Sequence, residues 1–92
     1  MTEIRRAATV RGVVQGVSFR WFTRQEAERL GLVGWVRNER DGSVRLEVQG
    51  PERDVEELLA WIRHGPTHAR VVDVEVSERA PTEVDIDFAI TH

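Results

Sequence analysis

The sequence contains no cysteine and no lysine, and each absence excludes a class of chemistry. Without cysteine, the chain can form no disulfide, no thiolate nucleophile and no cysteine-ligated zinc site. Without lysine, it has neither a Schiff-base amine nor the lysine of a Walker-type phosphate loop. All 13 basic residues are therefore arginines, whose planar guanidinium suits bidentate recognition of anions.

Long hydrophobic runs are also missing. No apolar run approaches the about 20 residues that cross a bilayer, and residues 1–6 lack the apolar centre of a secretory signal. We therefore expect a cytoplasmic protein with no membrane partner. The formal net charge of −3 argues against a nucleic-acid partner, because nucleic-acid-binding domains usually carry a basic surplus. The length of 92 residues predicts a single domain over residues 1–92, with one core and a monomeric state.

Hydrophobic periodicity predicts a strand, a helix and a hairpin in the first half of the chain. The strand covers residues 7–14, and the helix begins at Phe19 and stops at Gly31. The stripe of this helix consists of Phe19, Phe22 and Leu30, together with either Glu26 or Ala27. Strands at 33–38 and 43–49 flank a turn whose Asp41-Gly42 pair is a hairpin signal. The second of these strands has a buried face formed by Val44, Leu46 and Val48.

The second half of the chain predicts one helix and two strands. Pro51 suits a first helical turn, and Gly65-Pro66 ends the helix. Its apolar stripe is Val55, Leu58, Leu59 and Ile62. The strand at 71–77 alternates through Val72, Val74 and Val76. A last strand alternates through Val84, Ile86, Phe88 and Ile90, with Asp85 and Asp87 on a solvated face.

The resulting order is β-α-β-β-α-β followed by a short terminal strand. Two right-handed β-α-β crossovers place both helices on one face of an antiparallel sheet. The predicted fold class is therefore α+β, with the ferredoxin-like plan. This plan alone does not specify a function, because many unrelated activities use it.

The segment at residues 12–20 lies where the first predicted strand ends and the first helix begins. The first N–H groups of a helix have no partners within the helix and carry partial positive charge, so this place suits a phosphate group. Gly16 lets the backbone approach an anion, and Arg20 adds a guanidinium fork. The alternative is an ordinary strand–glycine–helix junction with a solvated arginine.

Asn38 ends the strand at 33–38 just before the predicted turn. A turn-forming role is the ordinary interpretation of such an asparagine. The functional interpretation is that its amide holds a water molecule, which an amide does without titrating. The spacing in the sequence does not decide whether Asn38 reaches Arg20.

Two segments together resemble the signatures of the acylphosphatase family. The first is Gly12-x-Val14-Gln15-Gly16-Val17-x-Phe19-Arg20, and the second is Gly34-Trp35-Val36-Arg37-Asn38. The resemblance covers nearly the whole chain, since further segments also fit: Asp41-Gly42, Gln49-Gly50-Pro51, Gly65-Pro66 and Phe88-x-Ile90.

The resemblance implies a ferredoxin-like hydrolase that converts an acyl phosphate and water to a carboxylate and inorganic phosphate, without metal or cofactor. It implies that Arg20 binds the phosphoryl oxygens and that Asn38 orients the attacking water. The N–H groups expected to help bind the phosphoryl oxygens belong to Gln15, Gly16, Val17, Ser18, Phe19 and Arg20. The expected partners are a small acyl phosphate and, as product-like ligands, phosphate or sulfate.

Some residues keep two interpretations. Many relatives carry glycine at the position of Ser18, whose hydroxyl then serves either as an extra donor or as a helix cap. Trp21 lies either at the mouth of the site or on an ordinary surface. The terminal carboxylate of His92 is a candidate partner of Arg20 in the empty enzyme. His64 and His68 do not have a spacing that indicates a metal site.

Two rival functions remain at this stage. An RNA-binding sheet needs exposed aromatic residues on its strands, which the first and third predicted strands lack. An acylphosphatase-like domain also occurs in larger proteins that handle carbamoyl phosphate, whereas this sequence predicts only one domain.

Overall fold

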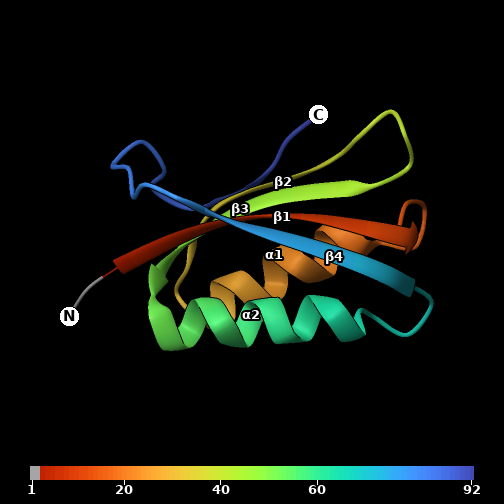
Figure 1. The fold of residues 1–92 in the computed structure, drawn as a ribbon, viewed down its shortest axis with the longest axis horizontal. Helices are drawn as coiled ribbons and strands as arrows, with labels where there is room; N and C mark the ends of the chain where they lie inside the picture. The colour runs from red at the N-terminus through yellow and green to blue at the C-terminus, as the bar shows by residue number, and fades with distance from the viewer. Residues whose placement is uncertain (1–2) are drawn as a thin grey trace.

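The computed structural model describes residues 3–92, which form a five-stranded sheet covered on one face by two helices (Figure 1). The elements in chain order are β1 (Glu3–Val13), α1 (Phe19–Arg29), β2 (Val33–Asn38), β3 (Val44–Pro51), α2 (Glu52–His64), β4 (Arg70–Arg79) and β5 (Phe88–Ile90). Neither helix in this part of the chain is long and apolar enough to cross a membrane.

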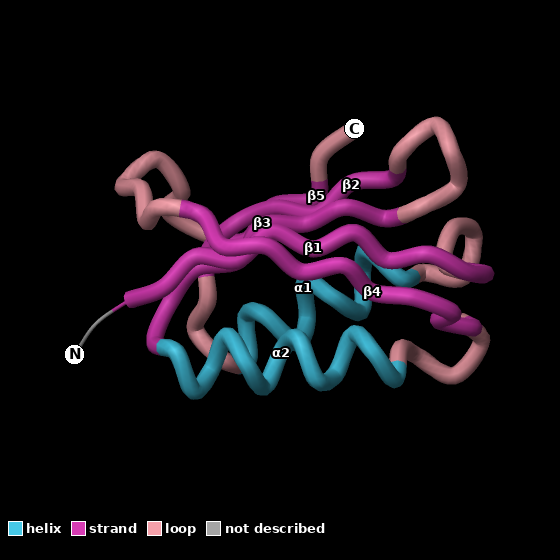
Figure 2. The backbone as a smooth tube through the Cα atoms, viewed as in Figure 1, coloured by secondary structure: helices cyan, strands magenta, loops and turns pink. Residues whose placement is uncertain are grey.

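The strand order is β4-β1-β3-β2-β5, which confirms the predicted ferredoxin-like plan (Figure 2). The first four strands in this order are antiparallel neighbours, whereas β5 pairs with β2 in parallel, so the sheet is mixed rather than fully antiparallel. β1 and β2 both pair with β3, and Val44 of β3 is opposite Val10 on one side and Asn38 on the other. The carboxyl ends of β1 and β2 therefore lie side by side at the same end of the sheet, one on each side of β3.

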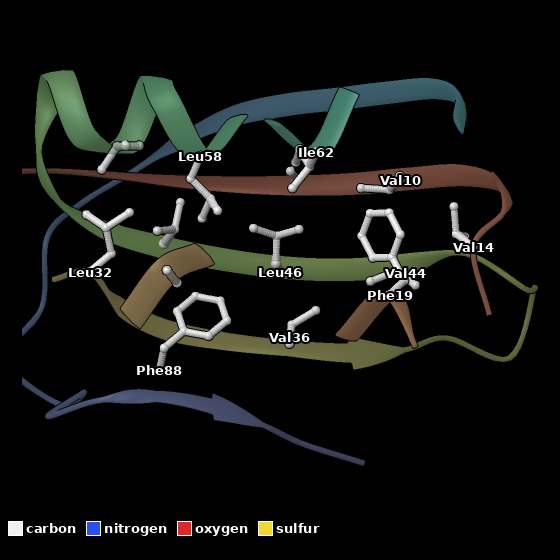
Figure 3. Close-up of a cluster of buried hydrophobic side chains, with 14 residues drawn as sticks. Val10, Val14, Phe19, Leu32, Val36, Val44, Leu46, Leu58, Ile62 and Phe88 are labelled. Carbon is white, nitrogen blue, oxygen red and sulfur yellow. The ribbon is translucent and has the colours of Figure 1, made fainter. Parts of the chain in front are cut away.

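The core lies between the helices and the sheet (Figure 3). The predicted inner face of β3 is confirmed, because all three of its valine and leucine side chains are fully buried. Burying one such side chain stabilises a fold by about 1.5–3 kcal/mol. Phe19, at the first position of α1, is also buried. The centroid of its ring lies 6.1 Å from that of Trp61 on α2. This contact anchors the beginning of α1 to the core.

The predicted stripe of α1 was wrong at Phe22. The buried positions are Phe19, Thr23 and Ala27, and Phe22 is 41% exposed. Thr23 is buried although it is polar, because its hydroxyl donates a 2.8 Å hydrogen bond to the carbonyl of Phe19 one turn earlier. The expected helix stop at Gly31 is confirmed, with a φ of 70°.

The predicted alternation of β4 was wrong at Val72. Arg11 pairs with Asp73 and Gly12 pairs with Val71, so the register shifts and Val72 is left over as a bulge. A bulge turns the following side chains to the other face of a strand. Val71 and Val74 therefore pack against the core, whereas Val72 is 74% exposed and Val76, also predicted to alternate with Val72 and Val74, is 38% exposed.

The predicted last strand was too long. Only Phe88–Ile90 pairs as β5, and Val84 and Ile86 are 82% and 90% exposed. The chain has to cross from β4 at one edge of the sheet to β5 at the other. Residues 80–87 make this crossing as a loop without a regular strand.

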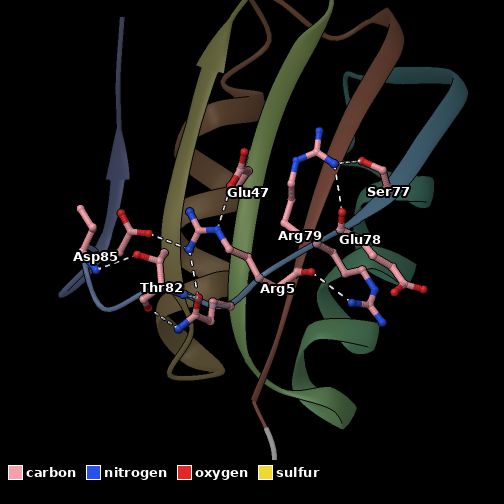
Figure 4. Close-up of polar contacts among 10 residues, drawn as sticks. Arg5, Glu47, Ser77, Glu78, Arg79, Thr82 and Asp85 are labelled. Carbon is pink, nitrogen blue, oxygen red and sulfur yellow. Dashed lines mark hydrogen bonds and ion pairs between the residues drawn. The ribbon is translucent and has the colours of Figure 1, made fainter.

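Asp85 does not lie on a solvated face as predicted. Its Oδ2 lies 2.7 Å from Nη1 of Arg5, and its side chain is only 17% exposed (Figure 4). Besides this ion pair with Asp85, Nε of Arg5 donates a hydrogen bond to Oε1 of Glu47, at 2.7 Å. Burial lowers the pKa of the Arg5 guanidinium, but the bonds to these two carboxylates outweigh burial and hold the pKa above its ordinary value. This buried cluster fastens the 80–87 crossing to the sheet.

Candidate active site

The loop at residues 14–18 and the first turn of α1 form a cradle of free main-chain donors. Gly16 and Ser18 adopt left-handed backbone conformations, with φ values of 75° and 60°. Among the residues that the structure describes, no hydrogen-bond acceptor is paired with the main-chain N–H groups of 15–21. The first turn of α1 contains no acidic residue, so the positive end of the helix dipole is not neutralised there. Such an arrangement binds a small anion.

A hydrogen-bonded bridge joins this cradle to the turn that follows β2. Nε2 of Gln15 donates to the carbonyl oxygens of Glu39 and Ser43, at 2.7 and 2.8 Å. The N–H of Glu39 donates to the same Ser43 carbonyl, at 2.8 Å. The sequence indicated a role only for the main chain of Gln15, and its side chain is a positioning contact that sequence reasoning missed.

Arg20 and Asn38 line the same cavity, of about 370 Å³. The complete lining is Val14, Gly16, Ser18, Phe19, Arg20, Trp21, Asn38 and Ile90. The tertiary structure thus brings together the two predicted catalytic side chains, which the spacing in the sequence left undecided. The reason is that β1 and β2 both pair with β3, which places their carboxyl ends at the same end of the sheet.

The Arg20 side chain is half-buried and makes no hydrogen bond or ion pair with any described residue. The suggested pairing with the terminal carboxylate of His92 was therefore wrong. An arginine that lines a cavity without an acidic partner keeps its donors available for an anion.

The side-chain oxygen of Asn38 is buried and has no hydrogen-bond partner among residues 3–92. The turn after β2 is closed by other groups: Glu39 bonds to Ser43, and Asp41 accepts bonds from the Ser43 N–H and hydroxyl, at 2.9 and 2.6 Å. The turn-forming interpretation of Asn38 is therefore not supported. Leaving a buried polar oxygen without a partner costs about 1–3 kcal/mol, which a donor bound in the cavity would offset.

Ser18 precedes α1, and its hydroxyl makes no capping hydrogen bond, so the capping interpretation was wrong. Its left-handed conformation is one that glycine adopts without strain, whereas a side chain there costs about 1–2 kcal/mol. The exposed hydroxyl of Ser18 lies at the cavity lining, where it is available as a donor.

Two further expectations concern residues near the cavity. Trp21 lines it, so the interpretation of this residue as part of the site mouth agrees with the geometry. His64 and His68 line a different cavity of about 680 Å³, which Val17 also lines. In residues 3–92, no group of three histidine, aspartate or glutamate side chains is arranged to hold a metal ion. Sequence reasoning missed Ile90 as a lining residue, because only the parallel pairing of β5 with β2 brings it there.

The fold and the site together define a small α+β domain with a cavity at the start of a helix, lined by Arg20 and free main-chain donors. Comparison with known proteins identifies its family. The acylphosphatase family model matches residues 6–90. An acylphosphatase of Rhizobium meliloti is 53% identical over 93 aligned positions, which cover 99% of this chain and 98% of the relative. The chain belongs to the acylphosphatase family.

Solved structures agree with this assignment. The crystal structure of an acylphosphatase from Bacillus subtilis superimposes with a TM-score of 0.92 at 34% identity, covering 97% of this chain and 99% of that one. A full-length HypF in its phosphate- and nucleotide-bound form matches with a TM-score of 0.86 at 28% identity, but the match covers only 12% of that chain. The resemblance inferred from the two signatures is confirmed: the protein is a hydrolase of acyl phosphates.

Proposed function

We propose that this protein hydrolyses acyl phosphates by direct attack of a water molecule that Asn38 orients, on a phosphoryl group that Arg20 and the cradle hold. No metal or organic cofactor takes part in this proposal. The observation that carries it is the buried Oδ1 of Asn38, which has no partner among the described residues and belongs to the cavity that Arg20 lines. A water molecule donating to this oxygen has its lone pair free to attack phosphorus.

The reaction needs little from the protein beyond positioning and charge stabilisation. The water oxygen forms a bond to phosphorus, and the bond from phosphorus to the acyl oxygen breaks. Its electron pair leaves with the carboxylate. A phosphoryl oxygen accepts the proton of the water, so the products are a carboxylate and dihydrogen phosphate. No general base is required, because the carboxylate is a good leaving group.

The cradle and Arg20 act on the phosphoryl oxygens. The N–H groups of residues 15–20 donate to these oxygens, and the guanidinium supplies a full positive charge. Since no carboxylate among the described residues pairs with Arg20, a phosphoryl group meets no internal competitor. Inorganic phosphate and sulfate share this geometry, so we expect both to inhibit competitively.

The decisive experiment is continuous hydrolysis of benzoyl phosphate in the presence of a chelator. Arg20→Ala should lower kcat/KM by about a thousandfold, since one donor to a developing charge contributes about 100- to 1000-fold and Arg20 also binds substrate. Arg20→Lys keeps the charge but loses the fork, so it should recover only part of this loss. Near-normal hydrolysis by Arg20→Ala, or loss of wild-type activity with chelator, would contradict the proposal.

Asn38→Ala separates the role of the water from phosphate binding. We expect a fall of about 100-fold in kcat, with the inhibition constant of inorganic phosphate changed less than about threefold. Equal losses in turnover and in phosphate binding would instead indicate a structural role for this residue.

We further propose that residues 1–92 act as one domain, as a cytoplasmic monomer without a nucleic-acid partner. One core shared by both helices supports the single domain, and the lack of cysteine agrees with a reducing compartment. Sedimentation at micromolar concentration tests the monomer, and a salt-dependent gel shift with RNA tests the absence of nucleic acid. A preference for carbamoyl phosphate over benzoyl phosphate would favour the rival function of a domain specialised for carbamoyl phosphate.

A further inference from the structure

One wall of the active-site cavity is apolar, and the proposed hydrolysis does not use it. Four of the lining residues are hydrophobic: Val14, Phe19, Trp21 and Ile90. Val14 and Phe19 are each 1% exposed, so they form the floor. Trp21 and the half-buried Ile90 are the apolar side chains that a bound molecule can touch.

Trp21 is not needed by the core. It is 45% exposed and does not belong to the cluster of buried residues or to the partly buried side chains packed on it. Its ring instead meets the ring of Phe22 edge to face, with centroids 5.0 Å apart and planes at 84°. Both aromatic side chains are more than 40% exposed, but only Trp21 lines the active-site cavity.

The chemistry of the substrate places its second half against this wall. In the proposed mechanism, the phosphoryl oxygens bind to the cradle and to Arg20, and the attacking water binds to the side chain of Asn38. The acyl group is joined to phosphorus through one bridging oxygen, so it begins beside the cradle and lies against the cavity surface that is left. That surface is the indole of Trp21 together with Ile90.

We propose that Trp21 is the specificity-determining contact for the acyl group, and that this protein favours acyl phosphates whose acyl group is flat and apolar. This inference rests on the proposed function, because it takes the phosphoryl position from it. A flat acyl group stacks on the exposed indole face, and Ile90 is the second accessible apolar side chain of the cavity. A small acyl group such as acetyl reaches little of this surface and gains little from it.

The test compares benzoyl phosphate with acetyl phosphate in Trp21→Ala. We expect the KM for benzoyl phosphate to rise about five- to tenfold, as for the loss of one aromatic contact. The KM for acetyl phosphate and the inhibition constant of inorganic phosphate should change less than about twofold. Trp21→Phe keeps a flat ring and should restore most of the preference for benzoyl phosphate.

Phe22→Leu is the matched control, since Phe22 is the adjacent exposed aromatic residue but lines the other cavity, with Trp61. It should leave the ratio of the two KM values unchanged. Equal changes for both substrates in Trp21→Ala would overturn the inference, and so would a larger change in Phe22→Leu than in Trp21→Ala. The proposed function fails separately, through the Arg20 and Asn38 variants assayed on acetyl phosphate alone.

Discussion

The side-chain amide of Gln15 donates a 2.8 Å hydrogen bond to the main-chain carbonyl of Ser43, 28 positions later in the chain. The same nitrogen donates at 2.7 Å to the carbonyl of Glu39, the residue after Asn38. One side chain therefore links the loop that supplies the cradle to the turn that follows Asn38. In the proposed mechanism, the distance between the phosphoryl group and the oriented water depends on this link.

We predict that Gln15→Leu lowers kcat while phosphate binding is largely kept. The leucine cannot donate to the two carbonyls, so the loop and the turn shift relative to each other. A misplacement of about 1 Å between reacting groups costs up to about 100-fold in rate. We expect kcat for benzoyl phosphate to fall about 10- to 100-fold, with the phosphate inhibition constant changed less than about threefold.

Gln49→Leu is the control for this prediction. Gln49 also joins distant segments, because its Nε2 donates to the Thr82 carbonyl at 2.7 Å, but it lies outside the cavity. It should lower the free energy of unfolding in urea and leave kcat unchanged. If both variants lost activity in proportion to stability, Gln15 would have no specific positioning role.

Gly16→Ala and Gly12→Ala should fail in different ways. A Cβ at Gly16 meets nothing within 4 Å, but the φ of 75° strains any other residue by about 1–2 kcal/mol. The loop then relaxes and turns its N–H groups, so phosphate inhibition should weaken about tenfold with little loss of stability. A Cβ at Gly12 would lie 2.0 Å from the Arg70 carbonyl oxygen, so that variant should lose about 3 kcal/mol or more of stability. Urea unfolding and phosphate inhibition measure the two effects.

Asp85→Asn should destabilise the fold without changing catalysis. It removes one of the two carboxylates that compensate the buried guanidinium of Arg5. We expect a loss of about 1–3 kcal/mol in the free energy of unfolding, because hydrogen bonds to charged groups contribute about that much. Asp87→Asn is the control, because Asp87 is exposed and forms no ion pair among the described residues. Similar unfolding curves for the two variants would contradict this account of the cluster.

The turn after Asn38 should weaken in acid through Asp41. The Ser43 hydroxyl and N–H donate to its carboxylate and hold its pKa below the ordinary value of about 3.9. Ionised Asp41 therefore stabilises the fold at pH values above the ordinary pKa. This contribution is lost as the pH falls through the lowered pKa. The difference in unfolding free energy between wild type and Asp41→Asn should be constant above about pH 5 and shrink below about pH 4.

Ser43→Ala provides an independent check on this pH dependence. It removes the hydroxyl donor, so the pKa of Asp41 should move back toward its ordinary value. An NMR titration of the Asp41 carboxyl carbon measures this pKa directly. An unchanged titration would show that the hydroxyl is not the cause of the lowered value.

Much of the fold was predictable because local periodicity follows burial. The strand at 33–38 was predicted with its observed bounds, and the valines and leucine of β3 are buried as expected. The failures have a common cause. Alternation in 71–77 and 84–90 cannot reveal the bulge at Val72 or the crossing loop, because both depend on which strand lies alongside.

The candidate site was predictable where its residues are consecutive in the sequence. Two glycine-containing signatures identified the family and named Arg20 and Asn38, since a main-chain cradle at a helix start needs particular residues in an unbroken run. The bridge from Gln15 and the wall formed by Trp21 and Ile90 were not predictable. They join segments that meet only through the pairing of β1 and β2 with β3 and of β5 with β2.

The amino-acid sequence alone was enough to exclude thiol and lysine chemistry, to predict the order of helices and strands, and to identify the family. These properties depend on composition and short-range spacing. The folded chain was needed to show that Arg20 and Asn38 share a cavity, that Asn38 keeps an unpartnered oxygen there, and that Asp85 is drawn onto Arg5. Such properties depend on strand register and on competition among distant partners, and neither can be obtained from the spacing of residues along the chain.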